Sequence, residues 1–546
     1  MQKCDYVFRS TNVFTAETPL EVAELAFAVR DSRILEIEKP SEILFNFEPE
    51  HEVIDFGEKF VCPGFHDAHL HFFHTALLNS PYMFFCIGES EADLVAKTVE
   101  FAEGLPEDAW VVTQGWRYYR WSPAVYPSKR SIDDAFPNRP CVMYSGDGHT
   151  LWLNTCAMEK LDIINNVNYL GKPGIEVDEN GDLTGVFHEA AAMELLPKCL
   201  RWLSDEQLVS AYENQMQNMA AIGITSICDM SLMPKEGCDF IRDDVYDALD
   251  EAGKLKLRVH MFPTLLDNQT RFFELQSKYS NNDYLYAPAF KQFFDGVSSE
   301  HTARLTQDYT NARFPGDRGE LIVPIVQMRK LVLAASKNGV ATRIHTIGDG
   351  AIHVALGIYE EAIATYGQPS SGRYTLEHLE NLLAEDIGKL AELGVVASSQ
   401  PCHITLDPGG PEKDLGEDRA KLMWPFKTFE ESGITQAFGT DSPITGVEPM
   451  NVLYAAVTRK DPHTHEPDGG WHPEQCISIA NALQNYTLGS AIAAGNEANI
   501  GTLEPGKFAD FVVLDQNLLA IDPEEIQQTK VLATYLGGEC VYNARK

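Results

Sequence analysis

Short stretches in which apolar and polar residues alternate lie near both ends of the chain, a pattern that predicts β-strands with one buried face. These stretches are YVFRSTNVFT, LAFAVRDSRILEIE and HEVIDFGEKFV near the N-terminus and GTLEPGKFADFVVLD and VLATYLGGECVYN near the C-terminus. Gly, Pro and other turn-forming residues separate them. We expect residues 1–60 and 495–546 to pair into one small, discontinuous β-sandwich domain, and two unrelated terminal hairpins are the alternative.

Between these ends, over residues 61–494, short apolar strands alternate with segments of helical periodicity, as in parallel β/α proteins. Eight strand candidates occupy residues 61–72, 223–232, 256–265, 289–296, 341–350, 373–381, 395–404 and 436–444. Most of them end in a polar residue followed by Gly, Pro, Ser or Asn. A (β/α)₈ barrel builds its site from such strand ends. The prediction is therefore an α/β fold with a TIM-type (β/α)₈ barrel.

The interval between the first and second strand candidates is too long for a single helix. Its segments AWVVTQGWRYYRW and CVMYSGDGHTLWLN are too irregular for one helix and too aromatic for a disordered linker. We expect a subdomain inserted at about residues 74–222.

Acidic side chains outnumber basic ones by 80 to 43, which gives a net charge of −37 at pH 7. Nucleic acids and anionic membranes attract clustered Lys and Arg, so this balance argues against both as partners. No apolar run approaches the roughly 20 residues of a membrane span, and the first ten residues do not form a secretory signal. Eleven cysteines without a Cys-x-x-Cys pair fit reduced thiols better than a disulfide framework. We expect a cytoplasmic protein that acts on a small-molecule substrate. The sequence does not decide whether the protein forms a homo-oligomer.

The first barrel strand carries Asp67, His69 and His71, which share one face because side chains alternate along a strand. Two imidazoles on one face suit zinc and similar divalent ions. Spacing alone is weak evidence, because His463 and His465 repeat it in the polar, proline-flanked run DPHTHEPDGG. The first pair is the better candidate, since a strand carries it inward and polar partners recur on later strands.

Those partners are Lys291, His345, His378 and Asp441, each at the end of a predicted strand. Together with them, the motifs PGFHDAHLH, FKQFFDGVSSEHTA, IHTIGDGA, LEHLEN, FGTDSPI, DGHTLWLN and IGTLEPGKFADFVVLD resemble the amidohydrolase superfamily. More narrowly, they are similar to its family 3 branch, which includes N-substituted formamide deformylase. The resemblance covers nearly the whole chain.

The resemblance implies a metal site and assigns its ligands. His69, His71 and Asp441 would bind one ion and His345 and His378 a second, with zinc the expected metal and a single ion the alternative. Lys291 would bridge the two ions as a carbamate, because a free ammonium cannot bind a cation. Read alone, Lys291 fits better a strand-end lysine paired with Asp295, and the other predicted ligands at matched strand ends reverse that preference.

The resemblance also implies a mechanism in which a metal-activated hydroxide attacks the substrate and Asp441 moves the proton to the leaving nitrogen. Candidate substrate contacts are His149, Trp116 and Arg304, with His301 and His403 as weaker ones. Nearby acids, expected to cap strand ends or to orient the ligand imidazoles, are Asp67, Asp295, Asp349, Glu377 and Glu380.

The predicted function is hydrolysis of a non-peptide carbon–nitrogen bond in an amide, formamide, urea or cyclic amide. The alternatives are a single-metal deaminase of a nitrogen heterocycle, a lactone or ester hydrolase, and a metal-free barrel that serves as a scaffold. Lys291 speaks against the deaminase, because single-metal deaminases of the superfamily generally lack a bridging lysine on the fourth strand. The scaffold would be expected to lack ligands, and the sequence retains all of them.

Overall fold

The computed structural model describes residues 3–43, 46–47, 51–146, 148, 150–164, 166, 172–199, 203–232 and 239–545. The chain divides into two compact units. Unit 1 comprises Met1–Phe72, Met216–Ile241 and Leu255–Lys546, and unit 2 comprises Phe73–Gln215 and Arg242–Lys254. Unit 2 overlaps the predicted insertion, while the domain boundaries expected from the sequence stay predictions.

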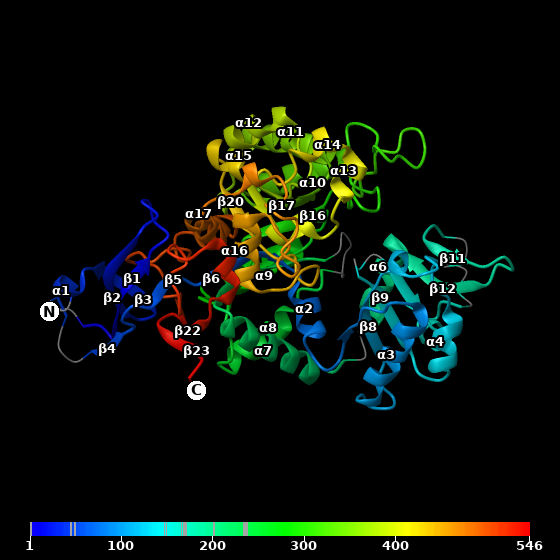
Figure 1. The fold of residues 1–546 in the computed structure, drawn as a ribbon, viewed down its shortest axis with the longest axis horizontal. Helices are drawn as coiled ribbons and strands as arrows, with labels where there is room; N and C mark the ends of the chain where they lie inside the picture. Colours follow the sequence, from blue (N-terminus) through cyan, green and yellow to red (C-terminus); the bar gives the residue numbers. More distant parts are fainter. Residues whose placement is uncertain are drawn as a thin grey trace. The chain divides into compact units, whose positions relative to one another are not determined.

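Both ends of the chain contribute strands to one eight-stranded sheet of unit 1 (Figure 1). Its strands are β1 (Tyr6–Phe14), β2 (Val22–Arg30), β3 (Arg33–Glu38), β4 (Glu52–Asp55), β5 (Phe60–Pro63), β21 (Phe511–Leu514), β22 (Val531–Leu536) and β23 (Glu539–Asn543). They follow the order β23-β22-β21-β5-β1-β2-β3, with β4 beside β1. The two ends meet where β21 runs antiparallel to β5, with Val512 opposite Cys62. Phe8, Phe27 and Phe511 pack together on this sheet, so its hydrophobic core also comes from both ends.

Two further sheets of unit 1 contain only parallel pairs. The first has the order β15 (Leu285–Tyr286), β14 (Arg258–Phe262), β13 (Ile224–Met230), β6 (Phe65–Leu70). The second has the order β16 (Ala289–Phe293), β17 (Ala341–Thr346), β18 (Thr375–His378), β19 (Val396–Ser399), β20 (Gln436–Phe438). Each of the eight predicted strands is present in these sheets, and the α/β class with parallel strands is confirmed.

Two isolated parallel bridges connect these sheets at both sides. Thr264, just after β14, pairs with Lys291 of β16, and Leu70 of β6 pairs with Ser442, just after β20. Backbone hydrogen bonds support both bridges, at 3.0 Å from Lys291 N to Pro263 O and 2.8 Å from His71 N to Ser442 O. The pairings thus run in a cycle from β6 through β13, β14 and β16–β20 back to β6.

Helices follow the parallel strands, as the periodicity predicts. In unit 1 the helices are α1 (Pro40–Ile43), α9 (Thr270–Lys278), α10 (Ile325–Lys337), α11 (Asp349–Tyr366), α12 (Ala384–Leu393), α13 (Gly410–Leu415), α14 (Glu417–Ala420), α15 (Phe426–Glu431), α16 (Pro449–Thr458), α17 (Ile479–Gln484) and α18 (Ser490–Ala493). Helix α12 ends at Gly394, whose left-handed conformation (φ 63°) closes the last turn. Among the described residues, no helix is both long and apolar enough to span a bilayer.

Unit 2 contains a six-stranded sheet with the order β11-β12-β10-β9-β8-β7. Its elements are α2 (Phe72–Leu78), β7 (Phe84–Phe85), α3 (Glu91–Glu103), β8 (Val111–Trp116), α4 (Lys129–Ala135), β9 (Cys141–Ser145), β10 (Thr150–Leu153), α5 (Thr155–Lys160), β11 (Ile175–Val177), β12 (Leu183–His188), α6 (Glu189–Cys199) and α8 (Asp243–Glu251), with α7 (Asp205–Ala221) leading from unit 2 into unit 1. Helix α8 belongs to unit 2 although the sequence placed it in the barrel. Its Tyr246 packs on Tyr212 of α7, with ring centroids 5.2 Å apart.

Candidate metal centre

His69, His71 and Asp441 come together where β6 and β20 end. The Nε2 atoms of His69 and His71 lie 3.4 and 3.3 Å from Oδ1 of Asp441, and all three side chains are buried. The backbone produces this arrangement, because Asp441 N donates to His69 O at 2.7 Å and Asp441 adopts a left-handed φ of 55°. One ligand atom from each residue lies within 4.8 Å of the others, so this trio can hold a divalent ion.

Both imidazoles have their Nδ1 atoms anchored by an acceptor. Nδ1 of His69 lies 2.6 Å from Oε2 of Glu377, and Nδ1 of His71 lies 3.0 Å from the carbonyl oxygen of Met230. Such contacts put the ring proton on Nδ1, so that the unprotonated Nε2 beside Asp441 can serve as the ligand atom. Burial lowers the pKa of His69 to about 4, which favours the neutral imidazole that binds metals.

Glu377 is itself held by a buried arginine. Its Oε1 accepts from Nε of Arg343 at 2.5 Å, and a second guanidinium nitrogen donates to Ala68 O at 2.8 Å. Burial would raise the pKa of Glu377, but the charge of Arg343 and the hydrogen bond with His69 hold it well below its ordinary value. The carboxylate therefore stays ionised and links β18, β17 and β6.

Lys291 on β16 is fully buried, and its Nζ has no hydrogen-bond partner among the described residues. Burial lowers the pKa of its amine to about 8, against the opposing charges of Glu377 and Asp441. The alternative partner Asp295 instead accepts from the backbone N–H groups of Arg304, Ile347 and Gly348. A lowered pKa increases the fraction of the amine in the neutral form that a carbamate requires.

His345 and His378 lie beside the trio at the ends of β17 and β18. Their ring centroids are 4.4 Å apart, and that of His378 is 4.9 Å from that of His69. Nε2 of His345 lies 3.2 Å from Gly296 O, whereas Nδ1 of His378 lies 2.8 Å from Oε1 of Gln400. Burial lowers the pKa of His345 to about 3, so both rings face the centre uncharged. All six predicted ligands thus lie on the strands of the two parallel sheets of unit 1 or within three residues of a strand's end.

His403 also reaches this centre, although the sequence suggested it only as a weak substrate contact. It follows β19 in a short 3₁₀ turn (Pro401–Thr405), and its Nε2 lies 3.8 Å from Oδ2 of Asp441. With His378 and Asp441 it forms a second trio whose ligand atoms all lie within 4.8 Å. Applying the strand-end rule to the segment PCHI, which ends the seventh predicted strand, identifies this residue.

The predicted acids divide between the two expected roles, holding strand ends and contacting ring nitrogens. Asp67 accepts from the backbone N–H groups of His69 and Thr440, and also from the hydroxyl of Thr440 at 2.6 Å. These bonds connect β6 with the turn after β20. Asp349 caps Thr306. Glu377 makes the expected ring contact, and Glu380 lies 3.8 Å from Nδ1 of His403.

Of the three main predicted substrate contacts, the structure describes Trp116 and Arg304. His149 lies outside the described residues. Trp116 lies in the hydrophobic core of unit 2 beside Trp152, and its indole N–H donates to Met143 O at 3.0 Å, which does not support a substrate role. Arg304 is half-buried, and its guanidinium donates to Gly319 O at 3.2 Å.

The second His-x-His pair, unlike His69 and His71, is exposed to solvent. His463 and His465 are exposed, and Nδ1 of His465 lies 2.8 Å from the hydroxyl of Tyr454. Neither belongs to a metal-competent trio within the described ranges. This contrast supports the strand pair as the ligands.

Another buried trio, His66, Cys228 and His260, lies on β6, β13 and β14. Nε2 of His66 is 3.4 Å from Sγ of Cys228. Both nitrogens of His260 have partners, Ile227 O at 3.2 Å and Asn496 Nδ2 at 3.0 Å. We assign this trio to the hydrogen-bonded interior of the fold.

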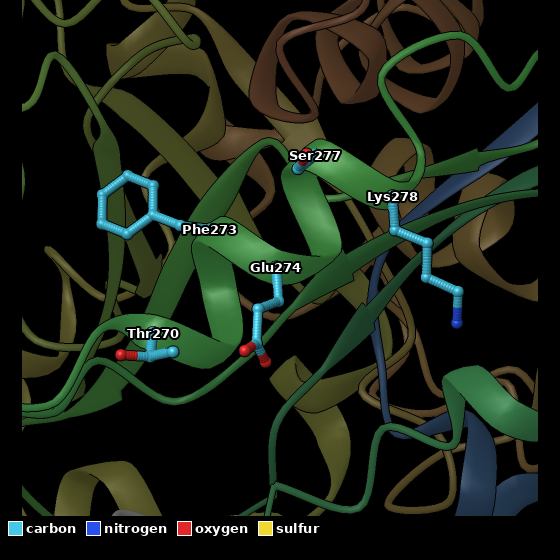
Figure 2. A pocket seen from close by; sticks show the side chains of 5 residues that line it. All are labelled: Thr270, Phe273, Glu274, Ser277 and Lys278. Atoms are coloured by element: carbon cyan, nitrogen blue, oxygen red, sulfur yellow. The ribbon is translucent and has the colours of Figure 1, made fainter.

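Side chains of helix α9 line a surface pocket, and the pocket contains none of the metal-centre residues. Figure 2 shows its lining side chains, Thr270, Phe273, Glu274, Ser277 and Lys278. None of them is a predicted site residue, so this pocket adds nothing to the metal centre.

Comparisons with known proteins give relatives that are similar in sequence and in fold. The chain is 27% identical over 545 residues to the Arabidopsis thaliana protein LONG AFTER FAR-RED 3, covering 98% of this chain and 91% of that protein. It is 24% identical over 568 residues to N-substituted formamide deformylase of Arthrobacter pascens, with 99% of each chain covered. The fold is similar to that of an uncharacterized metal-dependent hydrolase from Pyrococcus horikoshii OT3, with a TM-score of 0.77, 23% identity, and 95% of this chain and 99% of that one covered.

The model of the amidohydrolase family matches residues 52–542, a range that contains every residue of the metal centre. This chain belongs to the amidohydrolase family.

Proposed function

We propose that the protein is a metal-dependent hydrolase that cleaves a carbon–nitrogen bond other than a peptide bond in a small molecule. The observation that carries the proposal is the buried trio of His69, His71 and Asp441, in which each ring is anchored at Nδ1 and its Nε2 lies 3.4 Å or less from Oδ1 of Asp441. The similarity to a formamide deformylase favours amides, formamides, ureas and cyclic amides as substrates.

We further infer that the two parallel sheets form one closed (β/α)₈ barrel. The cyclic order of strand pairing supports this closure. In such a barrel the metal centre lies at the C-terminal ends of the strands, where barrel enzymes carry their sites. The sheet built from both chain ends would then be an accessory domain of unit 1.

The residues fit two divalent ions, with zinc the first choice because the ligands are imidazoles and a carboxylate. His69, His71 and Asp441 would hold one ion, and His345 and His378 the other, with Lys291 between them as a carbamate. When bound, such ions lower the pKa of a coordinated water and polarise a substrate carbonyl.

Asp441 has the position and the charge for proton transfer. Burial raises its pKa, but the nearby imidazoles of His69, His378 and His71 outweigh burial and hold it well below its ordinary value. The carboxylate therefore remains ionised near neutral pH and can accept a proton as the nucleophile attacks. It then donates that proton to the leaving nitrogen, so that an amine departs and not an amide anion.

The decisive experiment joins metal analysis to a substrate screen. The purified protein, loaded with zinc, is tested against formamides, other amides, ureas and cyclic amides, with lactones and heterocyclic amines as the competing classes. We expect hydrolysis confined to the carbon–nitrogen substrates. Turnover of ring amines alone would favour the single-metal deaminase, turnover of lactones alone an esterase, and a chain that binds no metal would refute the proposal.

A further inference from the structure

We propose that His378, His403 and Asp441 form a second metal position that does not require a carbamate on Lys291. The inference rests on the proposed metal-dependent function and deepens it. It differs from the ligand set that the resemblance implies, because it places His403 on the ion and makes Asp441 the bridging group.

The two oxygens of Asp441 face different sets of imidazoles. Oδ1 lies 3.4 and 3.3 Å from the Nε2 atoms of His69 and His71, whereas Oδ2 lies 3.8 Å from Nε2 of His403. In a tetrahedral zinc site with bonds of about 2.0–2.2 Å, neighbouring ligand atoms are about 3.3–3.5 Å apart. The spacing on the Oδ2 side is therefore close to that of a bound ion, and one carboxylate can serve two ions.

Both imidazoles of the new position have ligand atoms available. Gln400 accepts the Nδ1 proton of His378 at 2.8 Å, which leaves its Nε2 free. Nε2 of His403 is buried and has no hydrogen-bond partner among the described residues. The two rings are nearly parallel, at 7° with centroids 6.1 Å apart. A buried nitrogen without a partner is costly unless a ligand satisfies it.

Local backbone structure supports this placement. His378 ends β18 with a left-handed φ of 74°, and His403 lies in the turn that Pro401 begins directly after β19. Lys291, on β16, belongs to neither trio. Because His378 is common to this position and to the one beside His345, a single second ion occupies one position or the other.

The ligand set of two imidazoles and a carboxylate selects Zn²⁺ or Co²⁺ over Mg²⁺ and Ca²⁺, which prefer oxygen ligands. A carbamate forms from carbon dioxide, so a second ion that depends on Lys291 requires dissolved carbon dioxide or bicarbonate. An ion held by His403 does not. The two positions are therefore distinguishable by metal counting.

The test counts bound ions in the full-length protein, stripped of metal and titrated with Zn²⁺ against a chromophoric chelator. We expect two equivalents for the wild type, with or without carbon dioxide. Lys291→Ala should keep two equivalents, and Lys291→Ala combined with His403→Asn should bind one. As a matched control, Lys291→Ala combined with His353→Asn should keep two, because His353 is half-exposed on α11 and pairs with Asp386.

Loss of the second equivalent in Lys291→Ala, or in carbon dioxide-free wild type, would overturn the inference and leave the proposed function standing. Absence of any bound metal in the wild type would overturn both. If the double variant fails to fold by circular dichroism, the carbon dioxide-free titration of the wild type decides alone.

Discussion

Replacing Glu377 by Gln tests whether a buried carboxylate orients the metal ligand His69. Glu377 accepts through both oxygens, at 2.6 Å from His69 Nδ1 and 2.5 Å from Arg343 Nε. Glutamine has the same shape but a single oxygen, so one of the two contacts is lost. If its amide nitrogen faces His69, the ring proton moves to Nε2, where it blocks the metal. If it faces Arg343, two donors oppose each other.

The expected magnitude follows from the burial of all three groups. Arg343 is fully buried, and leaving a buried charge without its partner costs about 3–5 kcal/mol in unfolding free energy. Loss of a contact that orients a metal ligand lowers metal affinity by about 10- to 100-fold. The assays are urea denaturation of the metal-free protein and zinc competition against a chelator.

The chain supplies a matched control in the exposed pair of Arg329 and Glu361, in which both oxygens of Glu361 accept from the same guanidinium. Glu361→Gln should change neither stability nor zinc affinity appreciably, because solvent screens exposed ion pairs. Equal destabilisation by the two substitutions, or unchanged zinc affinity in Glu377→Gln, would refute the reasoning.

Three further substitutions test individual roles. Asp441→Asn keeps the size of the side chain and one ligand oxygen but removes basicity, so turnover of a true substrate should fall by at least about 10²-fold while much of the zinc is retained; near-normal turnover would remove Asp441 from the catalytic mechanism. The carbamate on Lys291 has its own test: with the second ion beside His345, Lys291→Ala should abolish activity, and a short carboxylic acid added with zinc should restore part of it by supplying the bridge; full activity without the acid would contradict the carbamate and fit an ion held by His403. His69→Ala should sharply reduce bound zinc, whereas replacing both His463 and His465 should leave it unchanged; equal losses would show that the strand context does not select the ligands.

The parallel strands could be predicted because buried strands leave a strong local pattern. Segments such as that ending at His345 are short apolar runs that stop at a polar residue and a glycine. The pair His69 and His71 was visible for the same reason, since alternation along one strand is a local property. Asp441 and Lys291 were recognisable only through the motifs that surround them.

The contacts between distant strands could not be predicted from the sequence. The position of His403 depends on how the turn after β19 folds back toward Asp441, and the pair of Arg343 and Glu377 depends on the register of β17 against β18. Trp116 looked available for substrate because aromatic residues suit both a pocket and a core. Its burial in unit 2 results from packing against residues far along the chain, which no local pattern records.

The sheet that joins the chain ends has a consequence for synthesis. Val512 pairs with Cys62 across 450 intervening steps of the chain, so β5 has no β21 beside it while the protein is being made. At about 5–20 residues per second, that interval lasts about 20–90 s. Through all of it the apolar edge of β5 is open to any other strand, and an open edge is a template for aggregation. The order of translation, and not the intrinsic speed of strand pairing, therefore sets when this part of the protein becomes native, and a chaperone that shields nascent β-strands would act here first.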